Sequence, residues 1–201
     1  MRGAVILAGG GSRRMGEDKA WLPVAGVPCL RRVAEAVAGP CPALVISARP
    51  NQRLPELPPG CVRVDDPQVD AGPLVGVGLG LDHLAEAGVE LAYLTSCDAA
   101  ALSPDHVAFM LEGLRARPER AAWVPVDAEG RRHPLAAAVR VPIIAARVRG
   151  LLASGVGRLQ AAVAGPDCPG VDASDLPDPA VLWPANTPEQ WRALERHVQG
   201  R

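Results

Sequence analysis

Three short, predominantly apolar runs place the tightest limits on how this chain can fold. They lie at Ala4–Leu7, Ala43–Ser47 and Leu91–Ser96. An apolar run of strand length without polar alternation is typical of a parallel strand that helices cover on both faces. The segments at about 29–38 and 73–87 carry apolar residues at helical spacing. The pattern therefore predicts an α/β fold with three α/β/α layers, a mostly parallel, Rossmann-like sheet and right-handed crossovers.

The rest of the chain carries weaker but readable signals. A helix from about 104 to 116 is expected, because Ser103 is a favourable N-cap and Pro104 suits the first helical position. Since no linker and no internal repeat is seen, a single domain over residues 1–201 is expected. The other predicted elements are a strand at 61–64, strands at 121–126 and 135–140 joined by the turn 127–130, helices at about 142–153 and 157–164, a last strand at Val181–Trp183 and a terminal helix from Thr187-Pro188.

Composition argues against several classes of function. The net charge of −1 and the aromatic content of 3% disfavour nucleic-acid binding, because they provide neither a basic surface nor a platform for stacking bases. No apolar stretch approaches the ~20 residues of a membrane span, and no signal peptide is seen. The five cysteines form no CxxC pair, so neither a zinc site nor a disulfide framework is indicated. We expect a cytoplasmic protein with reduced thiols and with no nucleic-acid or membrane partner.

A glycine-rich loop follows the first apolar run. Gly9-Gly10-Gly11 can adopt backbone angles closed to other residues and can bring amide groups close to an anion. Arg13, Arg14 and Lys19, the only lysine in the chain, could then neutralise phosphate oxygens. The spacing matches neither a Walker-type loop nor a dinucleotide-binding fingerprint, and Ala20 follows the lysine. Phosphate binding is favoured over the alternative, a plain turn with solvated basic side chains.

Carboxylates follow two other predicted strands. Asp98 comes after the strand at 91–96, and Asp66 comes after the strand at 61–64. Because ligands of open α/β sheets bind beyond the carboxyl ends of the strands, we expect Asp98 to face the glycine loop. There it could hold Mg²⁺ through one carboxylate together with substrate phosphates, the alternative being an Asx turn. Asp66 either forms a turn before Pro67 or binds a base, a ribose or a second metal.

A basic cluster lies at Arg131, Arg132 and His133. A general base at His133 is conceivable, but an acceptor that is already a phosphate needs none, so a structural or acceptor-positioning role is expected. The four histidines lack metal-ligand spacing. No grouping of Ser, Cys or His residues indicates a covalent nucleophile.

One long motif and five shorter segments carry a family resemblance. The motif runs from Leu7 to Lys19 and continues with Leu22-Pro23 and Gly26-x-Pro28. The shorter segments follow in order: Asp65-Asp66, Gly72-Pro73-Leu74-x-Gly76, Cys97-Asp98, His133-Pro134-Leu135 and Asn186-Thr187-Pro188-Glu189. Together they span essentially the whole chain, and they resemble the MobA-like nucleotidyltransferases, most closely the branch of molybdenum cofactor guanylyltransferases.

The resemblance implies a sheet of the nucleotide-diphospho-sugar transferase type and a reaction. GMP would pass from GTP to the terminal phosphate of molybdopterin or the molybdenum cofactor, with release of pyrophosphate. Lys19, Arg14 and Asp98 would be catalytic, with Mg²⁺ or Mn²⁺ at Asp98. Residues 1–118 would form the nucleotide-binding half and 119–201 the acceptor-side half, with transient contacts to cofactor-biosynthesis or acceptor enzymes. The implied nucleotide-binding residues are Leu7, Ala8, Gly9, Gly10, Gly11, Ser12, Lys19, Ser47, Asp66, Gly72 and Asp98.

Two positions differ from the family pattern. Members usually have a proline two residues after the Cys-Asp pair, where this chain has Ala100, and often an asparagine where it has Ser47. Three alternatives therefore stay open. They are cytidylyl transfer from CTP, nucleotidyl transfer to a sugar phosphate, and a nucleotide-binding carrier in cofactor delivery that has no transferase activity.

Overall fold

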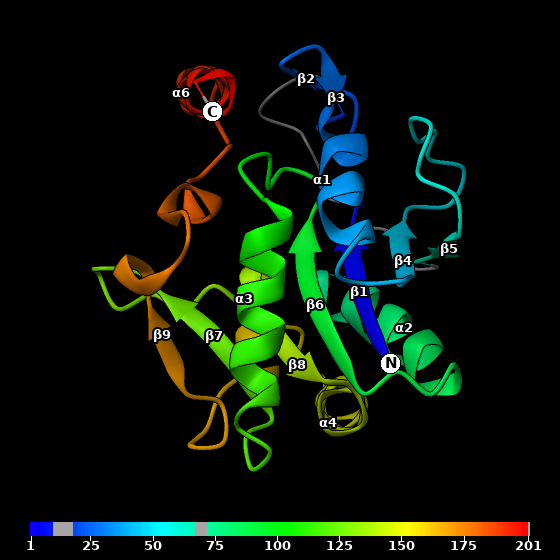
Figure 1. The fold of residues 1–201 in the computed structure, drawn as a ribbon. Helices are drawn as coiled ribbons and strands as arrows, with labels where there is room; N and C mark the ends of the chain where they lie inside the picture. The colour runs from blue at the N-terminus through cyan, green and yellow to red at the C-terminus, as the bar shows by residue number, and fades with distance from the viewer. Residues whose placement is uncertain (10–17, 67–71, 201) are drawn as a thin grey trace.

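A seven-stranded sheet forms the centre of the molecule in the computed structural model, which describes residues 1–9, 18–66 and 72–200. The strand order is β5-β4-β1-β6-β8-β7-β9 (Figure 1). Among the described residues, every pairing in this sheet is parallel except those of β8 with β6 and β7. The strands are β1 (Arg2–Leu7), β4 (Ala43–Ala48), β5 (Cys61–Asp65), β6 (Leu91–Ser96), β7 (Ala122–Val126), β8 (Ala138–Arg140) and β9 (Gly170–Asp172), and β2 (Pro23–Val24) and β3 (Val27–Pro28) form a separate hairpin. The predicted α/β class with a mostly parallel sheet is confirmed.

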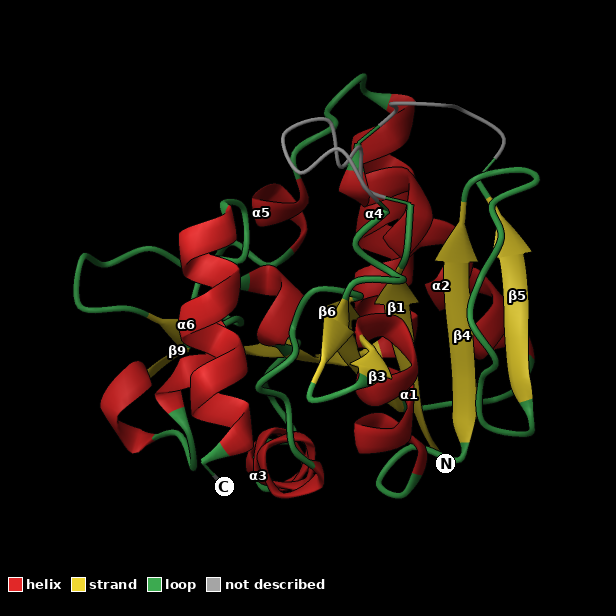
Figure 2. Cartoon of the chain, turned by 90° about the horizontal axis from the view of Figure 1, so that it is seen from above, coloured by secondary structure: helices red, strands yellow, loops and turns green. Residues whose placement is uncertain are grey.

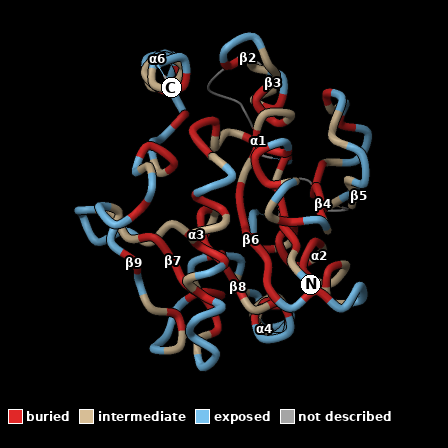
Figure 3. Tube along the Cα trace, in the orientation of Figure 1, coloured by how far each residue is buried: buried red, intermediate tan, exposed pale blue. Residues whose placement is uncertain are grey.

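Successive residues of the central strands face opposite helical layers, which explains why the predicted runs are apolar throughout. In β1, Ala4 and Ile6 join the core shared with α1 and α3, while Val5 joins the core shared with α2 and α4. The two layers are seen on either side of the sheet in Figure 2, and the chain of the central strands is buried in Figure 3. The helices are α1 (Cys29–Ala38), α2 (Pro73–Glu86), α3 (Pro104–Arg115), α4 (Val141–Ala153), α5 (Leu159–Ala162) and α6 (Pro188–Gln199).

The register of the three central strands aligns their carboxyl ends. Leu7, the last residue of β1, pairs with Ser47 of β4 on one side and Ser96 of β6 on the other. Just beyond, the Cys97 amide donates to the Leu7 carbonyl at 2.9 Å and the Ala8 amide donates to the Ser47 carbonyl at 2.8 Å. The loops that follow these strands therefore start side by side.

The helix starts predicted from N-caps are confirmed. The Ser103 hydroxyl accepts a hydrogen bond from the His106 amide at the start of α3, and the Thr187 hydroxyl accepts one from the Gln190 amide at the start of α6. Proline occupies the first turn of both helices, where its missing N–H costs nothing. No helix in the described part of the chain is long and apolar enough to cross a bilayer.

The predicted last strand at Val181–Trp183 is wrong. Residues Pro179–Leu182 instead form a short 3-10 helix, because the Asp178 carboxylate caps it by accepting a hydrogen bond from the Ala180 amide at 2.8 Å. The true last strand is β9, which pairs with β7. Its sequence, Gly-Val-Asp, contains no apolar run that would predict a strand.

Two further predicted elements are shorter than expected. The strand predicted at 135–140 is reduced to β8, because a 3-10 helix at Pro134–Ala136 precedes it. The helix predicted at 157–164 is reduced to the single turn of α5. The strands β7 and β8 nevertheless pair antiparallel, as the predicted turn between them requires.

Candidate active site

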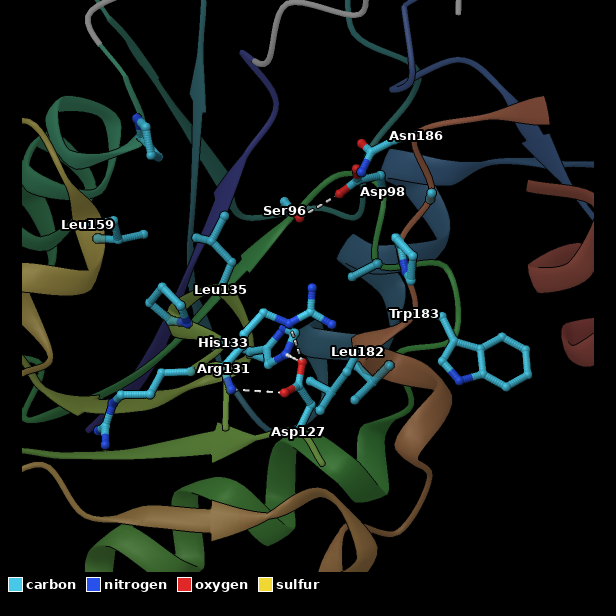
Figure 4. A pocket seen from close by; sticks show the side chains of 18 of the residues that line it. Ser96, Asp98, Asp127, Arg131, His133, Leu135, Leu159, Leu182, Trp183 and Asn186 are labelled. Carbon is cyan, nitrogen blue, oxygen red and sulfur yellow. Dashed lines mark hydrogen bonds and ion pairs between the residues drawn. The ribbon is translucent and has the colours of Figure 1, made fainter. Parts of the chain in front are cut away.

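Lys19 and Asp98 form an ion pair beyond the carboxyl ends of β1 and β6. The Lys19 Nζ lies 2.7 Å from Asp98 Oδ2 and also donates to Asn186 Oδ1 at 2.9 Å. The Ser96 hydroxyl donates to the other carboxylate oxygen, Asp98 Oδ1, at 2.6 Å. Figure 4 shows Ser96, Asp98 and Asn186 grouped together at one end of a pocket. The structure thus joins the predicted phosphate-binding lysine to the predicted metal ligand.

Tight turns fix the backbone that carries Asp98. The Ala99 amide donates to the Ser96 carbonyl at 3.2 Å, and the Ala100 amide donates to the Asp98 carbonyl at 2.9 Å. Ala100 and Ala101 are buried, so the small side chains pack into the core under α1 and α3. The backbone at Ala100 is therefore held by a hydrogen bond and by packing.

The donor set at Asp98 fits a Mg²⁺ ion that is held mainly by its substrate. In the described residues, no group of three His, Cys, Asp or Glu side chains could hold a metal ion by itself. The Asp98 side chain is 26% exposed, and Ser96 and Lys19 orient its two oxygens. One oriented, accessible carboxylate suits Mg²⁺, which takes one or two protein carboxylates together with substrate phosphates.

A pocket of about 590 Å³ extends from Asp98 toward the second half of the chain. One wall comes from the turn between β7 and β8, with Asp127, Arg131 and His133 (Figure 4). Apolar side chains, among them Leu159 of α5 and Leu182, line other parts of the pocket. The pocket is therefore continuous from the predicted metal ligand to the predicted acceptor-side half.

Asp127 is the centre of a charged cluster in this pocket. Its Oδ2 lies 2.9 Å from His133 Nε2 and 3.0 Å from the Arg131 guanidinium, and its Oδ1 accepts from the Arg131 amide. The hydrogen bond with His133 and the contacts with Arg131 outweigh desolvation and lower the pKa of Asp127 to about 2. Asp127 is thus ionised at neutral pH, and it holds the His133 ring against the pocket wall.

The thiol next to Asp98 is not a nucleophile. Burial, and to a smaller extent the charge of Asp98, raise the pKa of Cys97 well above its ordinary value. Burial also raises the pKa of Cys29, whose thiol interacts electrostatically with Cys97. Both groups are protonated thiols at neutral pH, and all five cysteines of the chain are free.

Comparison with known proteins identifies the family. Residues 4–168 match the family model of the MobA-like NTP transferase domain. The chain belongs to this family. It is a nucleotidyltransferase, and the family inferred from the glycine-loop motif is confirmed.

Sequence similarity to curated relatives covers nearly the whole chain. A protein of Mycobacterium avium named probable molybdenum cofactor guanylyltransferase is 34% identical over 197 residues, covering 94% of this chain and 93% of the relative. A protein of Mycobacterium tuberculosis H37Rv with the same name is 37% identical over 162 residues, covering 79% and 77%.

Solved structures share the fold. Molybdopterin-guanine dinucleotide biosynthesis protein A from Archaeoglobus fulgidus superposes with a TM-score of 0.72 at 18% identity, over 100% of both chains. A 2-C-methyl-D-erythritol 4-phosphate cytidylyltransferase from Thermus thermophilus superposes with a TM-score of 0.67, also at 18% identity, over 99% of this chain and 100% of the other. At such identities the likeness establishes the architecture and nothing finer.

The other residues predicted to bind nucleotide lie at the same edge of the sheet. Ser47 is buried at the end of β4, and α2 passes so close that a Cβ on Gly76 would lie 2.7 Å from the Ser47 hydroxyl oxygen. Gly72 precedes α2 with φ of +89°, a conformation that favours glycine. Asp66 follows the edge strand β5, its amide bonded to the Ala48 carbonyl, so β4 and β1 separate its strand from the strand of Asp98. Gly10, Gly11, Ser12 and Arg14 lie outside the described residues.

Sequence reasoning missed several groups that contact the predicted site residues. The sequence marks Asn186 only as part of a motif, and its contact with Lys19 joins positions 167 residues apart. Ser96 stands two residues before Asp98, a spacing that could have indicated a local hydrogen bond. The sequence predicts only a turn at Asp127, whereas in the structure its carboxylate also orients His133.

Proposed function

We propose that this nucleotidyltransferase transfers GMP from GTP to the terminal phosphate of molybdopterin or the molybdenum cofactor, releasing pyrophosphate and forming the guanine dinucleotide form of the cofactor. The names of the relatives at 34–37% identity support the acceptor and the nucleotide. The observation that carries the proposal is the Lys19–Asp98 pair at one end of a pocket that continues into the second half of the chain.

The residues around this pair would divide the work of binding the nucleotide. Lys19 and Arg14 would bind phosphate oxygens, since their charges oppose those of the triphosphate. Asp98 would hold Mg²⁺ or Mn²⁺, which neutralises charge on the transferring phosphoryl group when bound. The remaining nucleotide contacts would come from the loop Leu7–Ser12 and from Ser47, Asp66 and Gly72.

The chemical step would need positioning and charge neutralisation more than proton transfer. An oxygen of the acceptor phosphate attacks the α-phosphorus of GTP, a phosphoanhydride bond forms there, and the bond to the leaving pyrophosphate breaks. Because the attacking phosphate is already ionised, no general base is required. Asp127 and His133 would therefore orient the acceptor in the pocket and would not take its proton.

The two halves of the chain would act as one domain. Residues 1–118 would bind the nucleotide and residues 119–201 would supply the acceptor wall, with Arg131 and His133 suited to an anionic acceptor. The five free thiols suit a reducing cytoplasm. Release of product to an enzyme that uses the cofactor would require only a transient contact.

A product assay tests this proposal. The purified protein is incubated with Mg²⁺, molybdopterin and each of GTP, CTP, ATP and UTP in turn, and pyrophosphate and the dinucleotide product are measured. We expect a guanine dinucleotide from GTP alone, and an Asp98→Asn variant, which should form product far more slowly, serves as the control. A cytidine product, a product with a sugar phosphate in place of molybdopterin, or tight GTP binding without pyrophosphate release would each overturn it.

A further inference from the structure

The side chain of Gln52 binds two segments of the chain, one that precedes the glycine loop in the sequence and one that follows it. Its Nε2 donates to the Ala8 carbonyl at 3.0 Å and to Asp18 Oδ2 at 2.8 Å. Its Oε1 accepts a hydrogen bond from the Arg49 amide at 3.0 Å. Gln52 is only 8% exposed, so these hydrogen bonds satisfy an amide that has little access to water.

Asp18 receives further hydrogen bonds that fix its carboxylate. Its Oδ2 also accepts from the Arg49 guanidinium at 3.2 Å, and its Oδ1 accepts from the Ala20 amide at 3.0 Å. The first of these bonds ties Asp18 to the loop after β4. The second closes a short turn around Lys19, which lies between Asp18 and Ala20.

The backbone on the far side of Lys19 is equally constrained. Ala20 is fully buried, and its carbonyl accepts a hydrogen bond from the Leu30 amide of α1 at 3.2 Å. Lys19 is therefore held between a buried alanine and an aspartate that three groups bind. From this position its ammonium reaches both Asp98 and Asn186.

We propose that Gln52 is a positioning residue that ties Ala8, at the end of β1, to Asp18 and thereby sets where Lys19 presents its ammonium. This inference rests on the proposed function in that Lys19 is taken to act on the nucleotide phosphates. The Ala8 carbonyl and the Asp18 carboxylate are both acceptors, so a side chain that binds the two at once needs two N–H donors. The neutral amide of glutamine supplies both donors, whereas a carboxylate of the same size would supply none and would repel Asp18.

The test combines Gln52→Glu with Lys19→Ala in a double-mutant cycle. A misplacement of about 1 Å at a catalytic group can cost on the order of 10²-fold in rate. We expect Gln52→Glu alone to lower kcat by about 10²-fold with KM for the nucleotide changed less than about fivefold. In the Lys19→Ala background the same substitution should lower kcat less than about threefold, because the group it positions is gone. Equal losses in both backgrounds would show a general structural role and overturn the proposal.

Two further variants guard against simple misfolding. Gln52→Met keeps the length of the side chain and removes both donors without adding charge, and it should reproduce the loss of kcat. Gln199→Glu makes the same chemical change at an exposed position at the end of α6 and should leave activity unchanged. Wild-type activity in Gln52→Met would overturn the proposal even if Gln52→Glu fails to fold.

Amide hydrogen exchange gives a readout that does not depend on the reaction. The Ala20 amide donates to Asp18, so Gln52→Glu and Gln52→Met should speed its exchange at least tenfold while the amides of α3 keep their wild-type rates. If the wild-type protein makes no dinucleotide from any nucleotide, the proposed function fails, and this exchange still decides the role of Gln52. Unchanged exchange at Ala20 in both variants would overturn it.

Discussion

The Lys19 ammonium contacts the Asp98 carboxylate at 2.7 Å, although the two residues are 79 positions apart in the chain. The predicted ligand of phosphate and the predicted ligand of metal are thus partners of each other. The side chain of Lys19 is 15% exposed and that of Asp98 is 26% exposed, so the pair is largely buried but still accessible from the pocket. In the proposed function, the nucleotide binds Lys19 and the metal binds Asp98, so a substitution at either residue should affect the binding of both.

Replacing Lys19 by arginine should not be conservative. The ammonium is a compact charge that meets Asp98 and Asn186 at 2.7 and 2.9 Å, and a planar guanidinium cannot occupy the same point. We expect kcat/KM for the nucleotide to fall by about 10²-fold, the usual cost of losing one group that stabilises developing charge. Steady-state kinetics of pyrophosphate release measure the change. Arg115→Lys on the exposed surface of α3 is the control, and unchanged kinetics in Lys19→Arg would contradict the expectation.

Asp98→Asn should weaken the response to metal. The amide keeps the size of the carboxylate and removes the charge that an oxygen ligand of Mg²⁺ needs. The expected result is a rate loss of about 10²-fold or more and a higher Mg²⁺ concentration at half-maximal rate. A titration of activity with Mg²⁺ measures both quantities. Asp105→Asn, at an exposed position in the first turn of α3, should leave the titration unchanged.

Asp127→Asn should affect the acceptor and spare the nucleotide. The substitution removes the carboxylate charge that contacts the Arg131 guanidinium and the His133 ring, on the pocket wall that we propose to bind the acceptor. We expect KM for the acceptor to rise by about tenfold and KM for GTP to change less than about twofold. Varying each substrate in turn at a fixed level of the other separates the two effects. An equal rise in both values would show that the turn between β7 and β8 supports the whole site.

The parts of the fold that can be predicted from the sequence depend on residues that are close to one another in the chain. The run Ala4–Leu7 is apolar because both of its faces are covered, and Ser103 marks a helix start by a hydrogen bond three residues away. Strand β9 has one buried residue, Val171, and becomes a strand only through pairing with β7. The apolar run at Val181–Trp183 resembles a strand, but the cap at Asp178 and the proline after it start a 3-10 helix.

The same distinction holds for the candidate site. Asp98 could be placed beyond the carboxyl ends of β1 and β6, because strand ends share one edge of a parallel sheet. The contacts of Gln52 with Ala8 and Asp18 depend on the path of the loop after β4, which no periodicity in the sequence encodes. Asn186 meets Lys19 only because the segment before α6 returns to the sheet edge.

Protonation of His106 should make the fold sensitive to mild acid. The residue is 1% exposed in the core, it packs edge-on against Tyr93 at 5.9 Å, and neither ring nitrogen has a hydrogen-bond partner among the described residues. Burial lowers its pKa from 6.5 to about 4. The unfolded chain therefore binds a proton at higher pH than the folded protein does, and stability that is fully present above about pH 6.5 is lost as the pH falls toward 4.

Replacing His106 by phenylalanine should remove much of this dependence. The substitution keeps a ring against Tyr93 and removes the titrating group, so the loss of stability between pH 6.5 and 4 should shrink by up to roughly 3 kcal/mol. Urea unfolding at several pH values measures it. His83→Phe on the half-exposed side of α2 is the control and should keep the wild-type slope. An unchanged slope in His106→Phe would show that other groups set the acid limit.

Two helical glycines should respond in opposite directions to alanine. A Cβ on Gly113 of α3 would lie 1.4 Å from the ring of Trp123 in β7 and would clash with it. A Cβ on Gly150 of α4 would meet nothing within 4 Å. Gly113→Ala should destabilise the protein by about 3 kcal/mol through overpacking, and Gly150→Ala should stabilise it by up to about 1 kcal/mol through helix propensity. In thermal unfolding this corresponds to a Tm lower by roughly 10 °C and a Tm higher by about 2–4 °C. A Gly113→Ala variant with wild-type Tm would mean that Trp123 can move away from α3 at little cost.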